Sequence, residues 1–217
     1  MRVEQIMRKR VVTVEPSTTI GDALHLLRDN RIRHLPVVEH DQLVGIVSDR
    51  DLRDALPSSL LTHDDDHRVL QKPVAEIMKR EVLTAHPLDF IEEAAKQMYE
   101  QKIGSLPVVE KGKLAGIITQ TDLFHSLIEL FGVNKPSSHI EVEVDDRVGM
   151  LAEVSQIFRD AGVNVTSVVV FPGNDPTKKN LVFRIQTIDP RRVMQLLEEQ
   201  GFAVIGPTGP SEGVIPS

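Results

Sequence analysis

The feature that most constrains this chain is an internal repeat at an offset of 71 residues. Residues 3–52 align on residues 74–123 without a gap, and 19 of the 50 aligned positions are identical. The stretch GIVSDRDL returns as GIITQTDL, and LPVVE returns letter for letter. A repeat of this extent predicts two copies of one structural unit.

Each copy predicts the element order β-α-β-β-α. A short apolar strand precedes a proline, and apolar residues at helical spacing then indicate a helix with one buried face. Two more strands follow, joined by a tight turn at His40–Asp41 in the first copy and at Lys111–Gly112 in the second. A second helix begins within the repeated GIVSDRDL motif. The strands are expected at 11–14, 35–38 and 43–47, and at 82–85 for the first strand of the second copy.

Polar residues at the expected starts of the first helices predict N-terminal caps. Thr19 with Asp22 precedes the helix of the first copy, and Asp89 with Glu92 precedes the helix of the second. In such a pair, side-chain oxygens accept hydrogen bonds from backbone N–H groups that the first helical turn leaves free.

The repeat also sets the expected domain limits. The first unit is predicted at 1–56 and the second at 74–131, with an acidic linker at 57–73. A unit of about 55 residues buries little surface alone, so the two copies are expected to pack as a pseudo-two-fold pair. The predicted fold class is α/β (α+β).

The last third of the chain has a different pattern, after a connector rich in Gly, Asn, Pro and Ser. Residues 138–206 predict the order β-α-β-β-α-β, which is that of a ferredoxin-like sandwich. Leu151, Val154 and Phe158 are expected on the apolar face of its first helix. The tail at 207–217 is expected to be disordered.

The repeated motif supports two interpretations. Ser48 with Asp51, and Thr119 with Asp122, match a capping box, and a carboxylate in the first turn also suits the helix dipole. The same groups suit a ligand, because helix N–H groups receive phosphate and a carboxylate accepts ribose hydroxyls. Apolar strand edges would hold a base. The combination favours a nucleoside-phosphate site.

A glycine precedes each of these motifs within an otherwise apolar strand. Gly45 and Gly116 are unfavourable there, since glycine weakens a strand. Such a glycine often marks the close approach of another backbone or of a ligand, which adds weight to the interpretation as a site.

The motifs of the first 130 residues resemble those of the CBS domain, namely G-h-x-S/T-x-x-D, the T-x-x-P of each first strand and the LPVV run. Tandem CBS pairs form Bateman modules, which bind adenosyl nucleotides, so the resemblance implies two nucleotide sites. The implied first site contains Thr13, Ser48 and Asp51, backbone groups of Val14 and Val47, and Pro36, and the implied second site contains Thr84, Thr119 and Asp122, backbone groups of Ala85 and Ile118, and Pro107.

The third unit resembles the ACT domain, through DRVGML and the Gly-Val-Asn start of its second strand. Val148 stands where many ACT domains have proline. Gly149 and Asn164 are candidates to frame an amino-acid ligand, although a tight turn and a strand entry explain them equally well. The order of two CBS units and an ACT unit resembles the bacterial acetoin utilisation proteins, which implies a non-catalytic regulatory role in acetoin and butanediol breakdown.

The two predicted nucleotide sites differ in charge. The first copy has Arg33 and His34 beside its LPVV strand and Arg50 within its motif. The second copy has Gly104, Ser105 and Thr121 at those positions, with Ser105 assigned to the second site. Cations hydrogen-bonded to phosphate favour binding, so the first site is expected to prefer the more phosphorylated nucleotide. Arg31 is interpreted as a surface arginine.

Composition argues against several classes of function. The chain has no cysteine, a net charge of −7, one tyrosine and no tryptophan, so a nucleic-acid partner is not expected.

No apolar run approaches the roughly 20 residues of a membrane span, which predicts a cytoplasmic protein without a membrane partner. THDDDH places His63 and His67 around three aspartates, but a solvated acidic loop is favoured over a metal site. No spacing suggests a catalytic triad.

The sequence therefore predicts a cytoplasmic regulatory protein without a catalytic cofactor. Its expected ligand is an adenine nucleotide, AMP, ADP or ATP, with S-adenosylmethionine as an alternative. A homodimer is expected, and the regulated protein is unknown. Two rival hypotheses are an amino-acid sensor that acts through the ACT-like unit and an enzyme with an unrecognised site.

Overall fold

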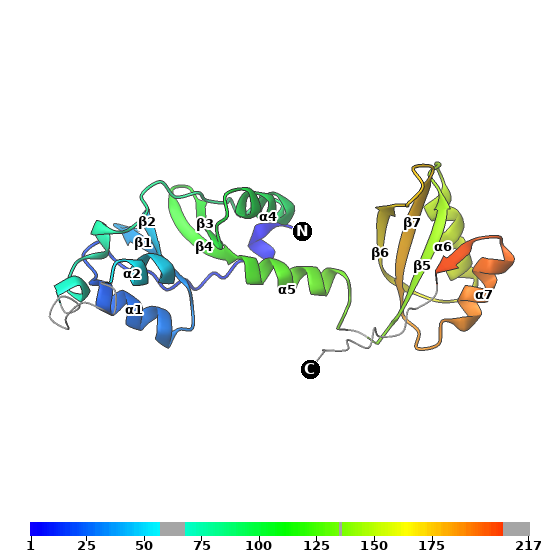
Figure 1. The fold of residues 1–217 in the computed structure, drawn as a ribbon, viewed down its shortest axis with the longest axis horizontal. Coiled ribbons are helices and arrows are strands. Elements are labelled where there is room, and N and C mark those ends of the chain that lie inside the picture. Colours follow the sequence, from blue (N-terminus) through cyan, green and yellow to red (C-terminus); the bar gives the residue numbers. More distant parts are fainter. Residues whose placement is uncertain (57–67, 135, 206–217) are drawn as a thin grey trace, which may run out of the picture. The chain divides into compact units, whose positions relative to one another are not determined.

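The structure is a computed structural model that describes residues 1–56, 68–134 and 136–205. The chain divides into two units, Met1–Phe124 and His125–Ser217, and each has its own four-stranded sheet (Figure 1). The first unit contains both predicted sites, and the second contains the ferredoxin-like domain. The THDDDH segment and the predicted disordered tail lie outside the described residues.

The first unit is built around an antiparallel sheet to which each repeat contributes one hairpin. The strand order is β1-β2-β4-β3, so the hairpins meet at β2 and β4, where Gln42 pairs with Lys113 (Figure 1). This arrangement confirms the pseudo-two-fold pair. The strands are β1 (His34–Glu39), β2 (Gln42–Ser48), β3 (Ser105–Glu110) and β4 (Lys113–Thr119), and the helices are η1 (Val3–Gln5), α1 (Ile20–Asp29), α2 (Asp49–Asp54), η2 (Val74–Glu76), α4 (Ile91–Glu100) and α5 (Gln120–Leu130).

The hairpin turns agree with the sequence analysis, but the predicted first strands do not. His40, Asp41, Lys111 and Gly112 all have positive φ, as a tight two-residue turn requires. The segments predicted as strands at 11–14 and 82–85 form only one parallel bridge each, to Val37 and Val108. The prediction of a strand is wrong because a proline follows two residues later and has no N–H to continue the pairing.

One of the two predicted helix caps is confirmed. The Thr19 hydroxyl accepts a hydrogen bond from the Asp22 N–H at 3.1 Å. The cap predicted at Asp89 is wrong, because α4 begins one residue later and its N-cap is Phe90. There the Glu93 carboxylate accepts a hydrogen bond from the Phe90 N–H.

The two repeats exchange their leading segments. Val74 and Met78, from the start of the second repeat, lie in the core of the first repeat. Val3 is fully buried in the core of the second repeat, with Ile6 and Met7 packed against it. Val69 and Leu70, in the described last part of the linker predicted at 57–73, also pack on the first core. Each repeat therefore completes its core with a segment of the other.

This exchange explains the glycines of the two motifs. A β-carbon on Gly45 would lie 2.6 Å from the Met78 sulfur and 3.1 Å from the Lys79 carbonyl oxygen. A β-carbon on Gly116 would lie 2.8 Å from the Met7 sulfur and 2.9 Å from the carbonyl oxygen of Arg8. Both glycines thus admit the exchanged backbone, which is the first of the two roles expected for them.

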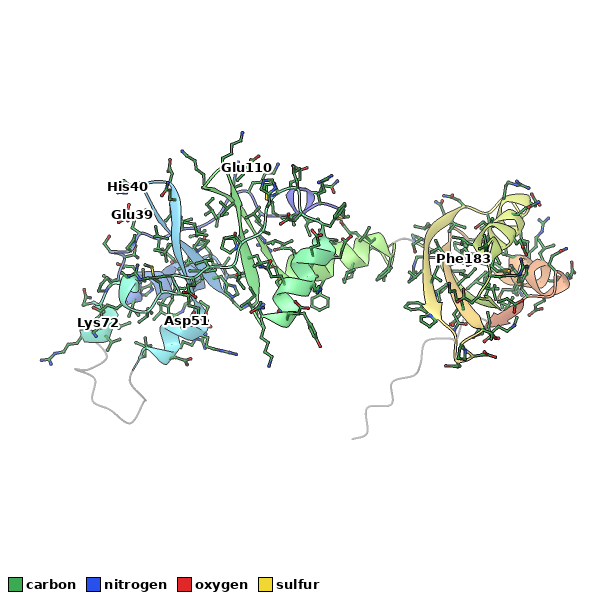
Figure 2. The ribbon with its side chains drawn as sticks, turned by 90° about the horizontal axis from the view of Figure 1, so that it is seen from above. Glu39, His40, Asp51, Lys72, Glu110 and Phe183 are labelled. Atoms are coloured by element: carbon green, nitrogen blue, oxygen red, sulfur yellow. The ribbon has the colours of Figure 1, made fainter. Side chains whose placement is uncertain are left out.

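The second unit has the strand order β6-β7-β5-β8, which confirms the ferredoxin-like sandwich. Val154 and Phe158 are buried as expected, and the Phe158 ring lies 4.6 Å from that of Phe183 between sheet and helices (Figure 2). Leu151 is 42% exposed, whereas Met150 is buried in its place. The elements are β5 (Ser138–Asp145), α6 (Met150–Asp160), β6 (Val165–Pro172), β7 (Lys178–Ile185), α7 (Arg191–Glu199) and β8 (Ala203–Ile205).

Candidate functional site

Both copies of the repeated motif form capping boxes. The Ser48 N–H donates to Asp51 Oδ2 at 2.9 Å, and the Asp51 N–H donates to the Ser48 hydroxyl at 3.2 Å. Thr119 and Asp122 make the same pair of bonds at 3.0 and 3.3 Å. Each hydroxyl also donates to the same carboxylate oxygen. One oxygen of each aspartate is thus used by the cap, and the other is left for a second partner.

The second oxygen of each aspartate faces a cation from the exchanged segment of the other repeat. Lys79 Nζ lies 3.6 Å from Asp51 Oδ1, and Arg8 Nε lies 3.1 Å from Asp122 Oδ1. Arg8 and Lys79 are equivalent positions of the repeat. Neither residue was predicted from the sequence as part of a site, although a basic residue directly follows each Ile-Met pair.

The electrostatic environment keeps Asp51 ionised. Burial is the largest single influence and opposes ionisation. Hydrogen bonds from the hydroxyl and N–H of Ser48, together with Lys79, outweigh it and lower the pKa of the Asp51 carboxyl below its ordinary value. Asp51 lies in the first turn of α2 (Figure 2). Its carboxylate therefore remains an acceptor at neutral pH.

The larger cavity of the first unit, here named cleft A, has a volume of about 450 Å³. Its lining draws on both repeats, because the pseudo-two-fold contact brings the start of β3 beside the motif at the end of β2. Cleft A contains five residues of the predicted first site, Arg33, His34, Ser48, Arg50 and Asp51. It also contains Ser105 and Pro107 of the predicted second site. Its other charged lining residues are Asp49, Lys79, Glu81 and Lys102.

A second cavity, here named cleft B, has a volume of about 260 Å³. It holds Thr119 of the second motif and adjoins Asp122 through Arg8. Arg31, predicted to be only a surface residue, lines cleft B rather than cleft A. The other residues that bear on its chemistry are Arg8, Arg10, Arg33, His34 and Thr121.

The remaining predicted site residues do not line either cleft within the described part of the chain. Thr13 and Thr84 are exposed, each just ahead of a bridge to β1 or β3. The others are buried in the cores or the sheet, and the backbone N–H and carbonyl groups of Val14 and Ala85 are already hydrogen-bonded to neighbouring backbone. These buried residues are Val14, Pro36, Val47, Ala85 and Ile118.

His34 and Gly104 form the boundary between the two clefts, since both residues line each of them. A β-carbon on Gly104 would lie 3.0 Å from the His34 ring, so glycine is needed for this approach. Next to it in cleft A, the Ser105 hydroxyl is buried without a hydrogen-bond partner. A buried unpaired hydroxyl is costly and is suited to receive a ligand group.

His34 is expected to make the stability of the protein depend on pH. Burial, followed by Arg33, lowers the pKa of the imidazole, while Asp51 opposes this and Lys79 and Asp49 have smaller effects. The unfolded chain binds the proton more readily, so the free energy of unfolding is greatest above about pH 6.5 and falls as the pH drops through the lower pKa of the folded state. Urea unfolding at several pH values measures this.

The matched variants for this test are His34→Gln and His25→Gln, since His25 is an exposed histidine on α1. The His34 variant is expected to lose part of the decrease in stability between about pH 7 and pH 5, and the His25 variant to keep it. An unchanged pH dependence in His34→Gln would show that this histidine does not carry the effect.

The candidate residues of the ACT-like unit have local structural roles. Gly149 has a φ of +94° and is the N-cap of α6, a conformation that favours glycine. The Asn164 side-chain N–H donates to Gln186 Oε1 at 3.2 Å, and the backbone carbonyl of Asn164 accepts a hydrogen bond from the backbone N–H of Gln186. Val148 beside them is 99% exposed. The tight turn and the strand entry are therefore present, and ligand binding at these residues stays a prediction.

In the ranges that the structure describes, no three His, Asp or Glu side chains gather as a metal site would require. The described helices also include none with the length and apolar character of a membrane span.

The first unit thus has two clefts related by a pseudo-two-fold axis, each beside a Ser/Thr-x-x-Asp cap, and this is the architecture of a paired module with two candidate sites. The CBS domain model matches residues 3–58 and 74–129, and the ACT domain model matches residues 138–202. The chain therefore belongs to the CBS domain family, with a tandem CBS pair followed by an ACT domain.

Solved structures are similar to the same part of the chain. A Vibrio cholerae protein assigned as an acetoin utilization protein, AcuB, is 35% identical with a TM-score of 0.54, over 62% of this chain and 95% of that one. The CBS pair of protein MJ0100, in complex with 5′-methylthioadenosine and S-adenosyl-L-methionine, is 31% identical with a TM-score of 0.51, over 62% and 98%. CBSX2 in complex with AMP is 32% identical with a TM-score of 0.51, over 59% and 96%.

Proposed function

We propose that this protein is a non-catalytic regulator that senses an adenine nucleotide through its CBS pair. The observation that carries the proposal is the second carboxylate oxygen of Asp51 and of Asp122, which the capping box does not use and which faces a cation. Two similar CBS structures hold AMP, or methylthioadenosine and S-adenosylmethionine, which have adenosine in common. An adenosyl compound is therefore the ligand class that this chain is proposed to bind.

The geometry suggests how such a ligand is held. A carboxylate oxygen has two lone pairs, so Asp51 Oδ1 can accept a ribose hydroxyl while Lys79 remains close. The buried hydroxyl of Ser105 gains a partner when a ligand enters cleft A. Cleft B repeats the carboxylate and the cation with Asp122 and Arg8.

Binding is proposed to regulate the ACT domain and the protein that it contacts. A ligand shifts an equilibrium only if it binds two arrangements with different affinity. His34 between the clefts is a candidate for this coupling, because its ring contacts both. We place the protein in acetoin or butanediol breakdown on the basis of the AcuB similarity, which covers 62% of the chain.

The protein is also proposed to form a homodimer in the cytoplasm. The first unit leaves large apolar side chains exposed, among them Leu88, Phe90 and Tyr99 at 52, 45 and 84%. Burial of such residues between two copies is favourable. Sedimentation of the full chain measures the oligomeric state.

A thermal-shift panel tests the proposed function. AMP, ADP, ATP and S-adenosylmethionine are compared with the common amino acids and with divalent metal ions. Ligand at a hundred times its dissociation constant is expected to add about 2.7 kcal/mol to the free energy of unfolding. Stabilisation by adenosyl compounds supports the proposal. Stabilisation by amino acids alone would instead favour a sensor that uses Gly149 and Asn164.

A further inference from the structure

We infer that the two clefts differ in the charge of their ligand, and that cleft B is the one selective for polyphosphate. Cleft A would take the adenosyl compound with fewer negative charges. The inference rests on the proposed function and deepens it, because it assigns ligand classes to the two clefts.

The basis is a comparison of equivalent positions around the two motif aspartates. In cleft A, cations and carboxylates balance, whereas cleft B has an excess of cations. Cleft A has Lys79, Lys102 and Arg50 with Glu81, Asp49 and Asp51, and cleft B has Arg8, Arg10 and Arg31 with Asp122 adjoining.

The largest single difference is at one pair of positions. Arg10 of cleft B corresponds to Glu81 of cleft A at the offset of 71, so the charge is reversed. Arg33 and His34 line both clefts and cannot distinguish them. The selectivity is therefore expected to come from Arg10. Asp49 adds a carboxylate to cleft A and offsets Arg50, whose counterpart in cleft B is the uncharged Thr121.

The shapes of the clefts are consistent with this division. Cleft A is the larger at about 450 Å³ and contains the buried Ser105 hydroxyl, so it is suited to enclose a nucleoside. Arg10 and Arg31 are exposed at cleft B, where a chain of phosphates extends into solvent and needs no enclosed volume. Each further phosphate adds negative charge near these arginines.

The inference reverses the expectation from sequence, which assigned the polyphosphate to the site of Ser48 and Asp51. That expectation rested on Arg33, His34 and Arg50, which do line cleft A, but Arg33 and His34 line cleft B as well. The structure adds Arg10 and Arg31 to cleft B, and it adds Glu81 and Asp49 to cleft A.

The test is a reciprocal charge change, Arg10→Glu and Glu81→Arg, with AMP and ATP affinities measured by calorimetry on the full chain at physiological salt. Arg10→Glu is expected to weaken ATP binding about tenfold or more, with a smaller effect on AMP, because an attraction becomes a repulsion. Glu81→Arg is expected to raise the affinity of cleft A for ATP. Both residues are exposed, so melting of the ligand-free variants verifies that they fold.

The outcomes separate the inference from the proposed function. If the wild type and Arg10→Glu bind ATP and AMP with the same ratio of affinities, the cleft assignment is overturned and the proposed function stays in place. The cleft assignment is also overturned if ATP binds at cleft A. In that case Asp51→Ala loses ATP binding and Asp122→Ala retains it. A wild-type protein that binds no adenosyl compound overturns both.

Discussion

Replacement of Asp51 and Asp122 together by alanine is expected to abolish the binding of AMP. Each variant removes the carboxylate that would accept the ribose hydroxyls, and each leaves a nearby cation, Lys79 or Arg8, without its partner. Stabilisation of about 2.7 kcal/mol at a hundredfold excess over the dissociation constant would therefore disappear. Each single variant is expected to retain the binding at the other cleft, and calorimetry measures the stoichiometry.

A control is needed because each aspartate also caps a helix. Loss of a cap costs about 1 kcal/mol, so the ligand-free melting temperature is expected to fall as well. Asp22→Ala removes a carboxylate of the same kind, which receives a hydrogen bond from Thr19 and lies outside both clefts. This variant is expected to lose stability and keep AMP binding. Undiminished AMP binding in the double variant would contradict the role of the two carboxylates.

Val3→Asp is expected to have the largest effect on stability, with a loss of at least about 3 kcal/mol. Val3 is fully buried in the core of the second repeat, and an aspartate there would bring a charge without a partner. Although Val3 belongs by sequence to the first repeat, it packs in the core of the second, so protection should be lost in β3 and β4 rather than in β1 and β2. Hydrogen exchange of the backbone amides distinguishes these strands.

The controls for this prediction are the equivalent and the neighbouring residues. Val74→Asp places the same charge in the core of the first repeat, so protection should be lost first in β1 and β2. Glu4→Gln changes an exposed residue next to Val3 and is expected to leave protection unchanged. Loss of protection in β1 and β2 on Val3→Asp would contradict the exchange of the leading segments.

Local patterns predicted most of the elements, because hydrophobic spacing and turn residues act over short distances. The hairpin turns and the ferredoxin-like order follow from such signals. The first strands were wrong because β pairing depends on a partner, and Val14 and Ala85 find only one residue to pair with before Pro16 and Pro87. At α4 the N-cap is Phe90, one residue after the predicted Asp89, and the carboxylate that accepts its N–H is that of Glu93. Asp89 is itself a good capping residue.

The arrangement of the site was harder to predict than the elements. The spacing within the repeated motif identified its two capping pairs, because a capping box is a local feature. These pairs are Ser48 with Asp51 and Thr119 with Asp122. The cations Arg8 and Lys79 approach from the opposite repeat, and a sequence with two copies does not show which copy supplies which cleft. The exchange of segments is a tertiary feature, and only Gly45 and Gly116 gave a sign of it.

The central claim is that adenosine binds with its ribose on the motif aspartates. A crystal structure of the full chain with AMP tests this most directly. The account predicts AMP in a cleft of the first unit, with ribose hydroxyls within hydrogen-bond distance of Asp51 or Asp122. AMP bound elsewhere on the protein, with both carboxylates still held only by their caps and by Lys79 and Arg8, would contradict it.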